Sequence, residues 1–157
     1  REVIVIIGQH LDMEKCSYDM ALLYIIKKID RLVCEDYVIV FVNSETNWDN
    51  VPSLGWQQHT FSIFNQHFCH NLANLYIIHP TLWTKTSLML MRPFANVSFW
   101  DKIVYIDRVL DIYKTFDFHL LNLPDFVFEY ENITFEALAT KIQSEIKLAI
   151  GPGDNDL

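Results

Sequence analysis

The stretch that decides the fold runs from residue 75 to residue 106 and reads LYIIHPTLWTKTSLMLMRPFANVSFWDKIVYI. It begins with an apolar segment, 75–78, that stops just before Pro80, and it ends with a second apolar segment, 103–106. Proline has no N–H to donate to a strand ladder, so it cannot continue a central strand. The stretch therefore predicts two buried strands joined by a helix over residues 81–91, with Pro93 marking the break after that helix.

The predicted helix over residues 81–91 is apolar on every side. At about 100° per residue, its apolar side chains fall at about 0°, 100°, 240°, 340°, 80° and 180° around the helix axis. These side chains are Leu82, Trp83, Leu88, Met89, Leu90 and Met91. Such a helix is either wholly buried or leaves apolar surface for a ligand, a membrane or another chain to cover.

Outward from this stretch, apolar strands alternate with helices. Residues 3–7 and 37–42 predict two more buried strands, and a predicted helix follows each of them. We expect Ser17 to cap the first of these helices, which runs to about Cys34, and Ser53 to open the second. This alternation predicts an α/β fold with a mixed, mainly parallel sheet that helices cover on both faces.

The C-terminal part of the sequence predicts smaller additions to the sheet. Residues 126–130 are rich in aromatic and branched side chains, and we interpret them as an edge strand. A last helix is expected to begin at Thr134 and to end at Gly151. We therefore expect a single domain over residues 2–150, followed by a flexible tail over residues 151–157.

Composition and charge disfavour several classes of function. A chain of 157 residues with 51% hydrophobic residues is large and apolar enough for one core. Its net charge is −8 and its Lys and Arg residues form no cluster, which argues against nucleic acid and against electrostatic docking on anionic lipids. No apolar run approaches the roughly 18 residues of a membrane span, so we expect no transmembrane segment. Three cysteines without metal-type spacing favour a reducing, cytoplasmic location.

Patterns typical of catalysis are missing from the sequence. None of the four glycines belongs to a phosphate-binding loop, and the Gly-x-Ser-x-Gly motif of a nucleophile elbow is absent. His59, His67 and His70 crowd one predicted helix, but they supply too few aligned ligands for a metal ion. We therefore expect a domain that is not an enzyme and that has no cofactor and no metal site.

Aromatic and methionine side chains gather on and around the predicted helix over residues 81–91. They can form either ordinary core or the wall of a pocket or interface. Lys85 and Arg92 are interpreted as surface charges or as contacts to a lipid headgroup, and His79, Pro80 and Pro93 as structural turn residues. The candidate ligand-binding or partner-binding residues are Leu82, Trp83, Lys85, Leu88, Met89, Arg92, Phe94, Phe99 and Trp100.

Several phrases, taken in order, resemble the CRAL-TRIO lipid-binding domain family. They are EDYVIVF at 35–41, PSLGW at 52–56, NLANLYIIHPTLW at 71–83, RPF at 92–94, KIVYI at 102–106 and LPDFVFEY at 123–130. The pair His79-Pro80 is similar to one branch, the BCH subgroup, which is found beside Rho GTPase-activating domains and, in another protein type, after a macro domain. The resemblance covers about residues 2–131.

The resemblance implies a non-catalytic domain of a larger signalling protein. Members of the BCH subgroup associate with themselves and with Rho-type small GTPases or their regulators, which implies a protein-interaction scaffold. In the wider family the helix between the two prolines gates a hydrophobic pocket, which implies instead a lipid-binding or lipid-transfer domain with its ligand under helix 81–91. We expect a single domain without the N-terminal helical lobe that many lipid-transfer relatives possess. Residues 65–70 also lack the basic segment usual in the BCH subgroup. A cytoplasmic location is expected, with a peripheral position at membranes as the alternative.

Overall fold

The computed structural model describes residues 1–11, 17–31, 34–46 and 51–150, with the backbone alone described at 65–67, 118 and 149–150. The chain divides into two compact units, Arg1–Asn122 and Leu123–Leu157. The single domain over residues 2–150 stays a prediction. The tail expected at residues 151–157 lies outside the described part of the chain.

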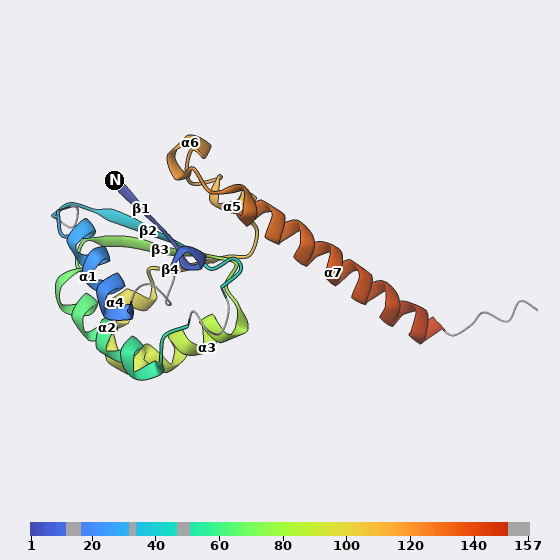
Figure 1. The fold of residues 1–157 in the computed structure, drawn as a ribbon, viewed down its shortest axis with the longest axis horizontal. Helices are drawn as coiled ribbons and strands as arrows, with labels where there is room; N and C mark the ends of the chain where they lie inside the picture. The colour runs from blue at the N-terminus through green and yellow to red at the C-terminus, as the bar shows by residue number, and fades with distance from the viewer. Residues whose placement is uncertain (12–16, 32–33, 47–50, 151–157) are drawn as a thin grey trace, which may run out of the picture. The chain divides into compact units, whose positions relative to one another are not determined.

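The first unit is built on a sheet of four parallel strands. These are β1 (Glu2–Ile7), β2 (Tyr37–Val42), β3 (Leu72–Ile78) and β4 (Ile103–Ile106), and each lies beside its neighbour in sequence (Figure 1). The α/β fold is thereby confirmed, and every described strand pair is parallel. β3 begins at Leu72, earlier than the predicted 75, because the parallel pairing with β2 continues past Asn74 to Leu72.

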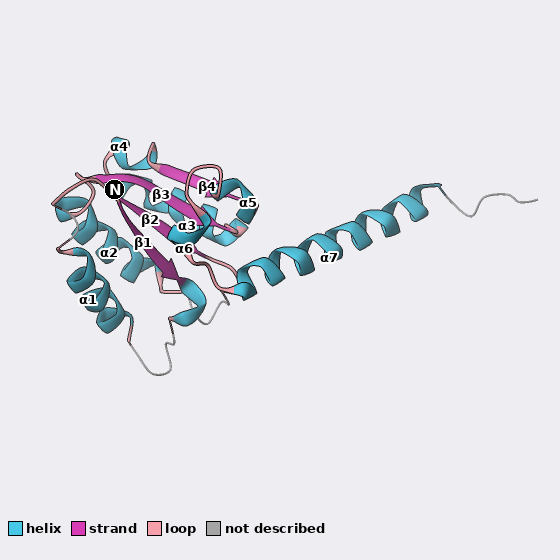
Figure 2. Cartoon of the chain, turned by 90° about the horizontal axis from the view of Figure 1, so that it is seen from above, coloured by secondary structure: helices cyan, strands magenta, loops and turns pink. Residues whose placement is uncertain are grey.

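The helices that connect the strands lie together on one face of the sheet. They are α1 (Tyr18–Ile29), α2 (Leu54–His67), α3 (Leu82–Met91) and α4 (Val97–Trp100). Right-handed crossovers between parallel strands in sequential order place every connecting helix on the same side. Figures 1 and 2 show this layer of helices from two directions.

Hydroxyl side chains begin the three longer connecting helices. The Oγ atoms of Ser17 and Ser53 each accept a backbone N–H three residues further on at 3.3 Å, and Oγ1 of Thr81 does so at 3.1 Å. Each cap satisfies a backbone donor that has no partner inside the helix. α1 ends at Ile29 rather than near Cys34, because the chain turns there to enter β2.

The opposite face of the sheet carries two short helices. α5 (Val109–Ile112) lies beside β4, and α6 (Phe118–Leu121) lies beside β1. Between them, the ring of Phe116 meets Tyr76 of β3 edge-on, with 5.3 Å between ring centroids. Helical segments therefore lie on both faces, as expected for a parallel sheet.

The second unit contains one long helix, α7 (Asp125–Ile150). The edge strand predicted at residues 126–130 is wrong, because these residues form the first turns of α7. Asp125 places a negative charge in the first turn, where the N-terminal end of the helix dipole favours it. Thr134 is not an N-cap either: its hydroxyl donates to the Tyr130 carbonyl at 2.7 Å, a bond that a threonine can make inside a continuous helix. No helix within the described ranges is long and apolar enough to cross a membrane.

Candidate ligand-binding cavity

A cavity of about 330 Å³, here called the inner cavity, lies between the sheet and helices α2 and α3. Side chains alternate between the two faces of a strand, so every second residue of β2 points toward this cavity. In β3 the alternation is interrupted between Leu72 and Leu75, where the pairing with β2 shifts its register. The sheet side of the cavity is lined by Ile6, Tyr37, Ile39, Phe41, Leu72, Leu75 and Ile77. Nearly all of these side chains are apolar, so the floor of the cavity is apolar.

The helices line the cavity with residues at helical spacing. In α2 the lining positions include 57, 60, 61 and 64, and in α3 they are 83, 84, 87 and 88. Steps of three and four residues bring such positions onto one face of a helix. Phe61 and Phe64 supply the α2 wall, and Trp83 and Leu88 supply the α3 wall. The crossover helices thus form one wall of the inner cavity, and residues of the connection between β2 and α2, such as Thr46 and Pro52, add to it.

The end of the inner cavity next to β2 is closed by Tyr37 and Cys69. The Tyr37 hydroxyl is fully buried and donates to the Phe68 carbonyl at 2.6 Å. Burial, and secondly the neighbouring Cys69, raises the pKa of the Tyr37 phenol. Burial also raises the pKa of the Cys69 thiol, and nearby Lys102 offsets part of that effect. Both groups are therefore neutral near neutral pH, and they add no charge to the wall.

Thr84 lines the inner cavity with a hydroxyl that hydrogen-bonds to the Thr81 hydroxyl at 2.8 Å. Three other Ser or Thr residues interrupt the apolar wall: Thr46, Thr60 and Ser87. Their side-chain oxygens are buried, and none has a hydrogen-bond partner among the described residues. Ser87 itself is only 5% exposed. A buried hydroxyl that lacks a partner costs roughly 1–3 kcal/mol.

A second hollow of about 360 Å³, the outer cavity, adjoins the first at the start of α3. Both cavities are lined by Asn43, Thr46, Val51, Trp83 and Thr84. Thr81, Leu82 and Thr86 line the outer cavity alone. The two cavities therefore adjoin along these residues, and the inner one is more apolar whereas the outer one is rich in hydroxyl groups.

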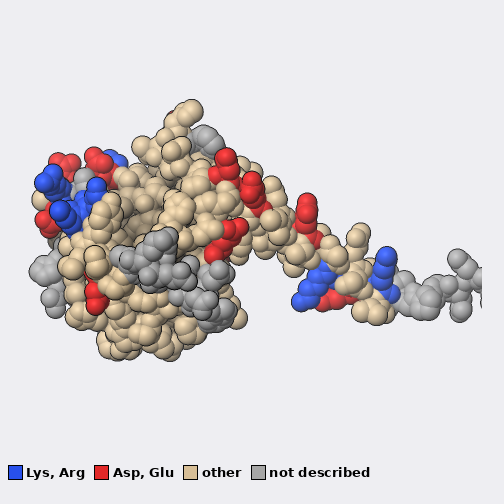
Figure 3. Space-filling model, in the orientation of Figure 1, with Lys and Arg blue, Asp and Glu red and all other residues tan. Residues whose placement is uncertain are grey.

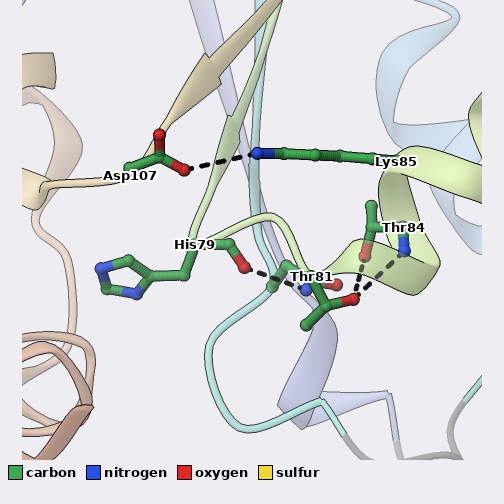
Figure 4. A network of polar contacts seen from close by, with 6 residues as sticks. His79, Thr81, Thr84, Lys85 and Asp107 are labelled. Atoms are coloured by element: carbon green, nitrogen blue, oxygen red, sulfur yellow. Dashed lines mark hydrogen bonds and ion pairs between the residues drawn. The ribbon is translucent and has the colours of Figure 1, made fainter. Parts of the chain in front are cut away.

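The turn between β3 and α3 is held by residues at the carboxyl ends of the strands. His79 has a positive φ of 53° and is buried, and its Nδ1 lies 2.8 Å from the Ser44 hydroxyl. The His79 backbone N–H donates to the Ile106 carbonyl at 2.8 Å. Its carbonyl accepts a bond from the Asn43 side chain at 3.1 Å. Figure 4 shows this turn leading through Thr81 into α3. It positions the first turn of α3 over the cavity.

The structure divides the residues that the sequence proposes for binding. Trp83, Leu88 and Phe99 line the inner cavity. Trp100 is not among the described lining residues, but its ring stacks on that of Phe61, with 6.0 Å between ring centroids. Lys85 is exposed and forms an ion pair with Asp107 at 3.7 Å, on the outer side of α3 (Figure 4).

Other proposed residues lie outside the lining of the inner cavity. Arg92 is exposed, and it shares with Pro93 the 3-10 turn η3 (Arg92–Phe94) that follows α3. Several large apolar side chains on α3 and in the residues after it are also exposed, and we call this set the exposed apolar surface. Its members are Leu82 (83% exposed), Met89 (70%), Leu90 (50%), Phe94 (45%) and Val97 (81%).

The apolar character of this region is visible on the molecular surface. On the face drawn in Figure 3, Lys and Arg side chains gather beside α1, whereas few charged side chains lie over α2 and α3. The helix that is apolar on every side in sequence is therefore neither wholly buried nor wholly exposed. One face of α3 lines the inner cavity, and the other contributes to the exposed apolar surface.

Some cavity residues are not predicted from the sequence. Thr46, Thr60 and Ser87 are small polar residues, and in sequence they are indistinguishable from residues on a solvent-facing side of a helix or loop. Phe61 and Phe64 share one side of the second predicted helix with Leu54 and Phe68, which indicates burial but not that a space lies beside them. Only the way in which α2 and α3 pack over the sheet reveals the cavity.

Comparison with known proteins covers the first unit and extends into the first turns of α7. A family model described as "Divergent CRAL/TRIO domain" matches residues 1–132. The Rho GTPase-activating protein gacY of Dictyostelium discoideum is 40% identical over 80% of this chain and 17% of its own length. Caytaxin of Macaca fascicularis is 33% identical over 73% of this chain and 31% of its own length. The GDAP2 homolog of Drosophila melanogaster is 32% identical over 85% of this chain and 25% of its own length. The chain thus spans less than a third of each of these three relatives.

Proposed function

Since the chain belongs to the divergent CRAL/TRIO domain family, we propose that it is a non-catalytic domain of a signalling protein that holds a small apolar ligand in the inner cavity. The single observation that carries this proposal is the apolar space between β2, β3, α2 and α3. Its volume of about 330 Å³ lies within the range typical of small-molecule sites, about 300–1,000 Å³. This is the alternative function considered from the sequence, and the geometry favours it over a scaffold role.

The apolar lining of the inner cavity favours an apolar ligand. Each Å² of apolar surface that such a ligand buries contributes about 25 cal/mol.

Helix α3 is the wall that a ligand would displace on entering. Its start is held by the His79 turn, and its outer side is linked to the end of β4 through the Lys85–Asp107 ion pair. Both partners of that pair are exposed, and exposed pairs contribute at most about 1 kcal/mol. The ion pair therefore does not lock α3 in place, and we propose that α3 opens to admit the ligand.

Two neighbouring residues of α3 provide a matched test of the proposal. Leu88 lines the inner cavity, and Met89 is 70% exposed. We expect Leu88→Asp to abolish ligand uptake, because it places a charge in an apolar wall, and Met89→Asp to leave uptake unchanged.

Ligand content is measured by native mass spectrometry of the purified domain, with organic extraction to identify what co-purifies. An apolar molecule bound near one to one in the wild type and in Met89→Asp, but lost in Leu88→Asp, supports the proposal. Repeated preparations without such a molecule, together with no uptake of added apolar probes, would contradict it.

A second candidate function is protein interaction, and the exposed apolar surface favours it. Monomeric proteins rarely expose large contiguous apolar patches, and such patches mark interaction sites. The name of one relative, a Rho GTPase-activating protein, suggests a Rho-type GTPase or its regulator as partner, and a second copy of the chain is the other choice.

The same pair of variants separates this function from ligand binding. If the exposed apolar surface is a protein interface, we expect Met89→Asp to abolish the association. Removing the ligand from the wild-type domain is expected to leave the association intact. Light scattering after size-exclusion chromatography measures self-association, and titration with a purified Rho-type GTPase measures the heterotypic contact. If the wild-type domain and the Met89→Asp variant are both monomeric and neither binds the GTPase, both partners are excluded.

A further inference from the structure

The hydroxyl groups of Thr60 and Ser87 differ from those of other hydroxyl residues on the same helices. In α3, the Thr86 hydroxyl donates to the Leu82 carbonyl at 2.8 Å. In α2, the Ser62 hydroxyl donates to the His59 carbonyl at 2.7 Å. Such bonds to the preceding turn are the usual way in which a helical Ser or Thr satisfies its hydroxyl. Thr60 and Ser87 make no such bond in the described structure, although both oxygens are buried.

Both residues lie where the two helices face the inner cavity. Thr60 lies beside Phe61 in α2, and Ser87 lies beside Leu88 in α3, and all four line the same space. A side-chain rotation between staggered χ1 rotamers redirects a serine or threonine hydroxyl without moving the backbone. A polar group on a ligand inside the cavity can then satisfy oxygens that the protein itself leaves unsatisfied.

Among the residues that the structure describes, the walls of both cavities carry no charged side chain. Of the residues described as lining them, none is Lys, Arg, His, Asp or Glu. Two lysines on neighbouring elements are engaged elsewhere: Lys85 pairs with Asp107, and Lys102 donates to the Cys69 carbonyl at 2.8 Å. A carboxylate or phosphate enclosed here would lose its water without gaining a counter-charge, which is strongly unfavourable.

The volume of the inner cavity limits the part of the ligand that it encloses. An engineered protein cavity of about 150 Å³ holds benzene, which has six carbon atoms. By proportion, about 330 Å³ accommodates about a dozen non-hydrogen atoms. The enclosed part is therefore the size of one short hydrocarbon chain or ring system with one polar group.

From these observations we propose that the ligand is an uncharged amphiphile whose hydroxyl or carbonyl group hydrogen-bonds to Thr60 and Ser87. This inference rests on the proposed function, that is, on the presence of an apolar ligand in the inner cavity. It adds the chemical class of that ligand, a neutral lipid alcohol or ester and not a fatty acid or a phospholipid headgroup. It also assigns a specificity role to two residues.

Three probes with the same carbon skeleton test the ligand class. Butylbenzene has no polar group, 4-phenylbutanol carries a hydroxyl, and 4-phenylbutanoate is ionised at neutral pH. Their affinities for the ligand-stripped domain are measured by isothermal titration calorimetry. We expect the alcohol to bind at least about tenfold more tightly than the carboxylate, because the described walls of the cavity offer hydroxyl groups but no cation.

Variants then test the role of the two hydroxyls. Ser87→Ala and Thr60→Val remove the oxygen and keep the rest of the side chain close to its original shape. We expect each to weaken the alcohol about three- to tenfold, the loss typical of one neutral hydrogen bond, and to leave butylbenzene unchanged. Ser62→Ala is the matched control, since its exposed hydroxyl bonds within α2, and it is expected to change neither affinity.

The outcomes distinguish this inference from the proposed function. If butylbenzene binds but the carboxylate binds as tightly as the alcohol, or if the two variants weaken all probes equally, the inference is wrong and the proposed function stands. If none of the three probes binds, both fail.

The melting temperature of ligand-free Ser87→Ala provides a further check. We expect it to be unchanged or higher, since a buried unsatisfied group is removed, and a fall of several degrees would assign the hydroxyl a structural role instead.

Discussion

Two neighbouring residues of β2, Ile39 and Val40, point to opposite faces of the sheet and allow a direct test of where the cavity lies. Ile39 lines the inner cavity and is 8% exposed, whereas Val40 is fully buried and is not among the described lining residues. Truncating either side chain to alanine removes apolar contacts on one face only. We therefore expect both changes to destabilise the fold but only one to affect ligand binding.

The expected magnitudes follow from the atoms removed. Ile39→Ala deletes three carbons, worth about 2.4 kcal/mol of transfer free energy at about 0.8 kcal/mol each, and Val40→Ala deletes two, worth about 1.6 kcal/mol. A cavity term adds to both, so we expect losses in the free energy of unfolding of about 2–5 kcal/mol for Ile39→Ala and somewhat less for Val40→Ala. Because Ile39 already borders a space, its neighbours are less able to close around the deletion.

Urea unfolding of the ligand-free protein measures these losses, and butylbenzene titration of the same samples measures binding. Ile39→Ala is expected to change the probe affinity, since it enlarges the cavity, whereas Val40→Ala is expected to leave it within about twofold of wild type. The reverse result, with Val40→Ala altering affinity and Ile39→Ala not, would place the ligand on the other face of the sheet and refute the assignment.

Three further predictions concern the groups around the cavity. Tyr37→Phe removes the bond to the Phe68 carbonyl and is expected to lower the free energy of unfolding by about 1–3 kcal/mol, as measured by urea unfolding. Since burial raises the pKa of Tyr37 above its ordinary value of 10.0, its contribution to stability is fully present below pH 10 and is lost as the pH rises above it. Wild type should therefore lose stability more steeply than Tyr37→Phe in that range, and parallel curves would contradict this. His79→Gly is expected to be more stable than His79→Ala by about 1 kcal/mol, because only glycine adopts a φ of 53° without steric cost, and equal melting curves would argue against strain at this turn. Lys85→Ala should change the free energy of unfolding by less than about 1 kcal/mol, because its pair with Asp107 is exposed, and a larger loss would show that this pair locks α3.

Local signals in the sequence are sufficient for most of the first unit. Apolar segments bounded by polar residues and prolines predict the four strands, and hydroxyl residues before apolar periodic segments predict the starts of α1 and α2. These features are short-range, because a strand run or an N-cap involves residues only a few positions apart. The family resemblance drawn from the same phrases is confirmed by the match over residues 1–132.

The wrong prediction at residues 126–130 has a physical explanation. Phe126, Val127, Phe128 and Tyr130 have side chains that favour strands, but strand propensity is weak and depends on a partner strand to pair with. In the structure these residues continue into the helical periodicity of α7 instead, with no interruption at Thr134. The strand propensity of these five residues is therefore outweighed by the continuous helix of 26 residues in which they lie.

The sequence by itself determined the α/β fold, the family, the apolar character of α3 on every side, and the lack of charge clusters that would point to polyanionic partners. Only the tertiary structure decided which way each side chain of α3 faces: Trp83, Ser87 and Leu88 toward a cavity, and Leu82 and Met89 toward the surface. It also brought Thr60 and Ser87, 27 positions apart in sequence, to the wall of one space. The physical reason is that periodicity records the local conformation of the chain, whereas a cavity depends on how far apart two packed elements stand, and that distance is set by side chains from β2, β3, α2 and α3 together.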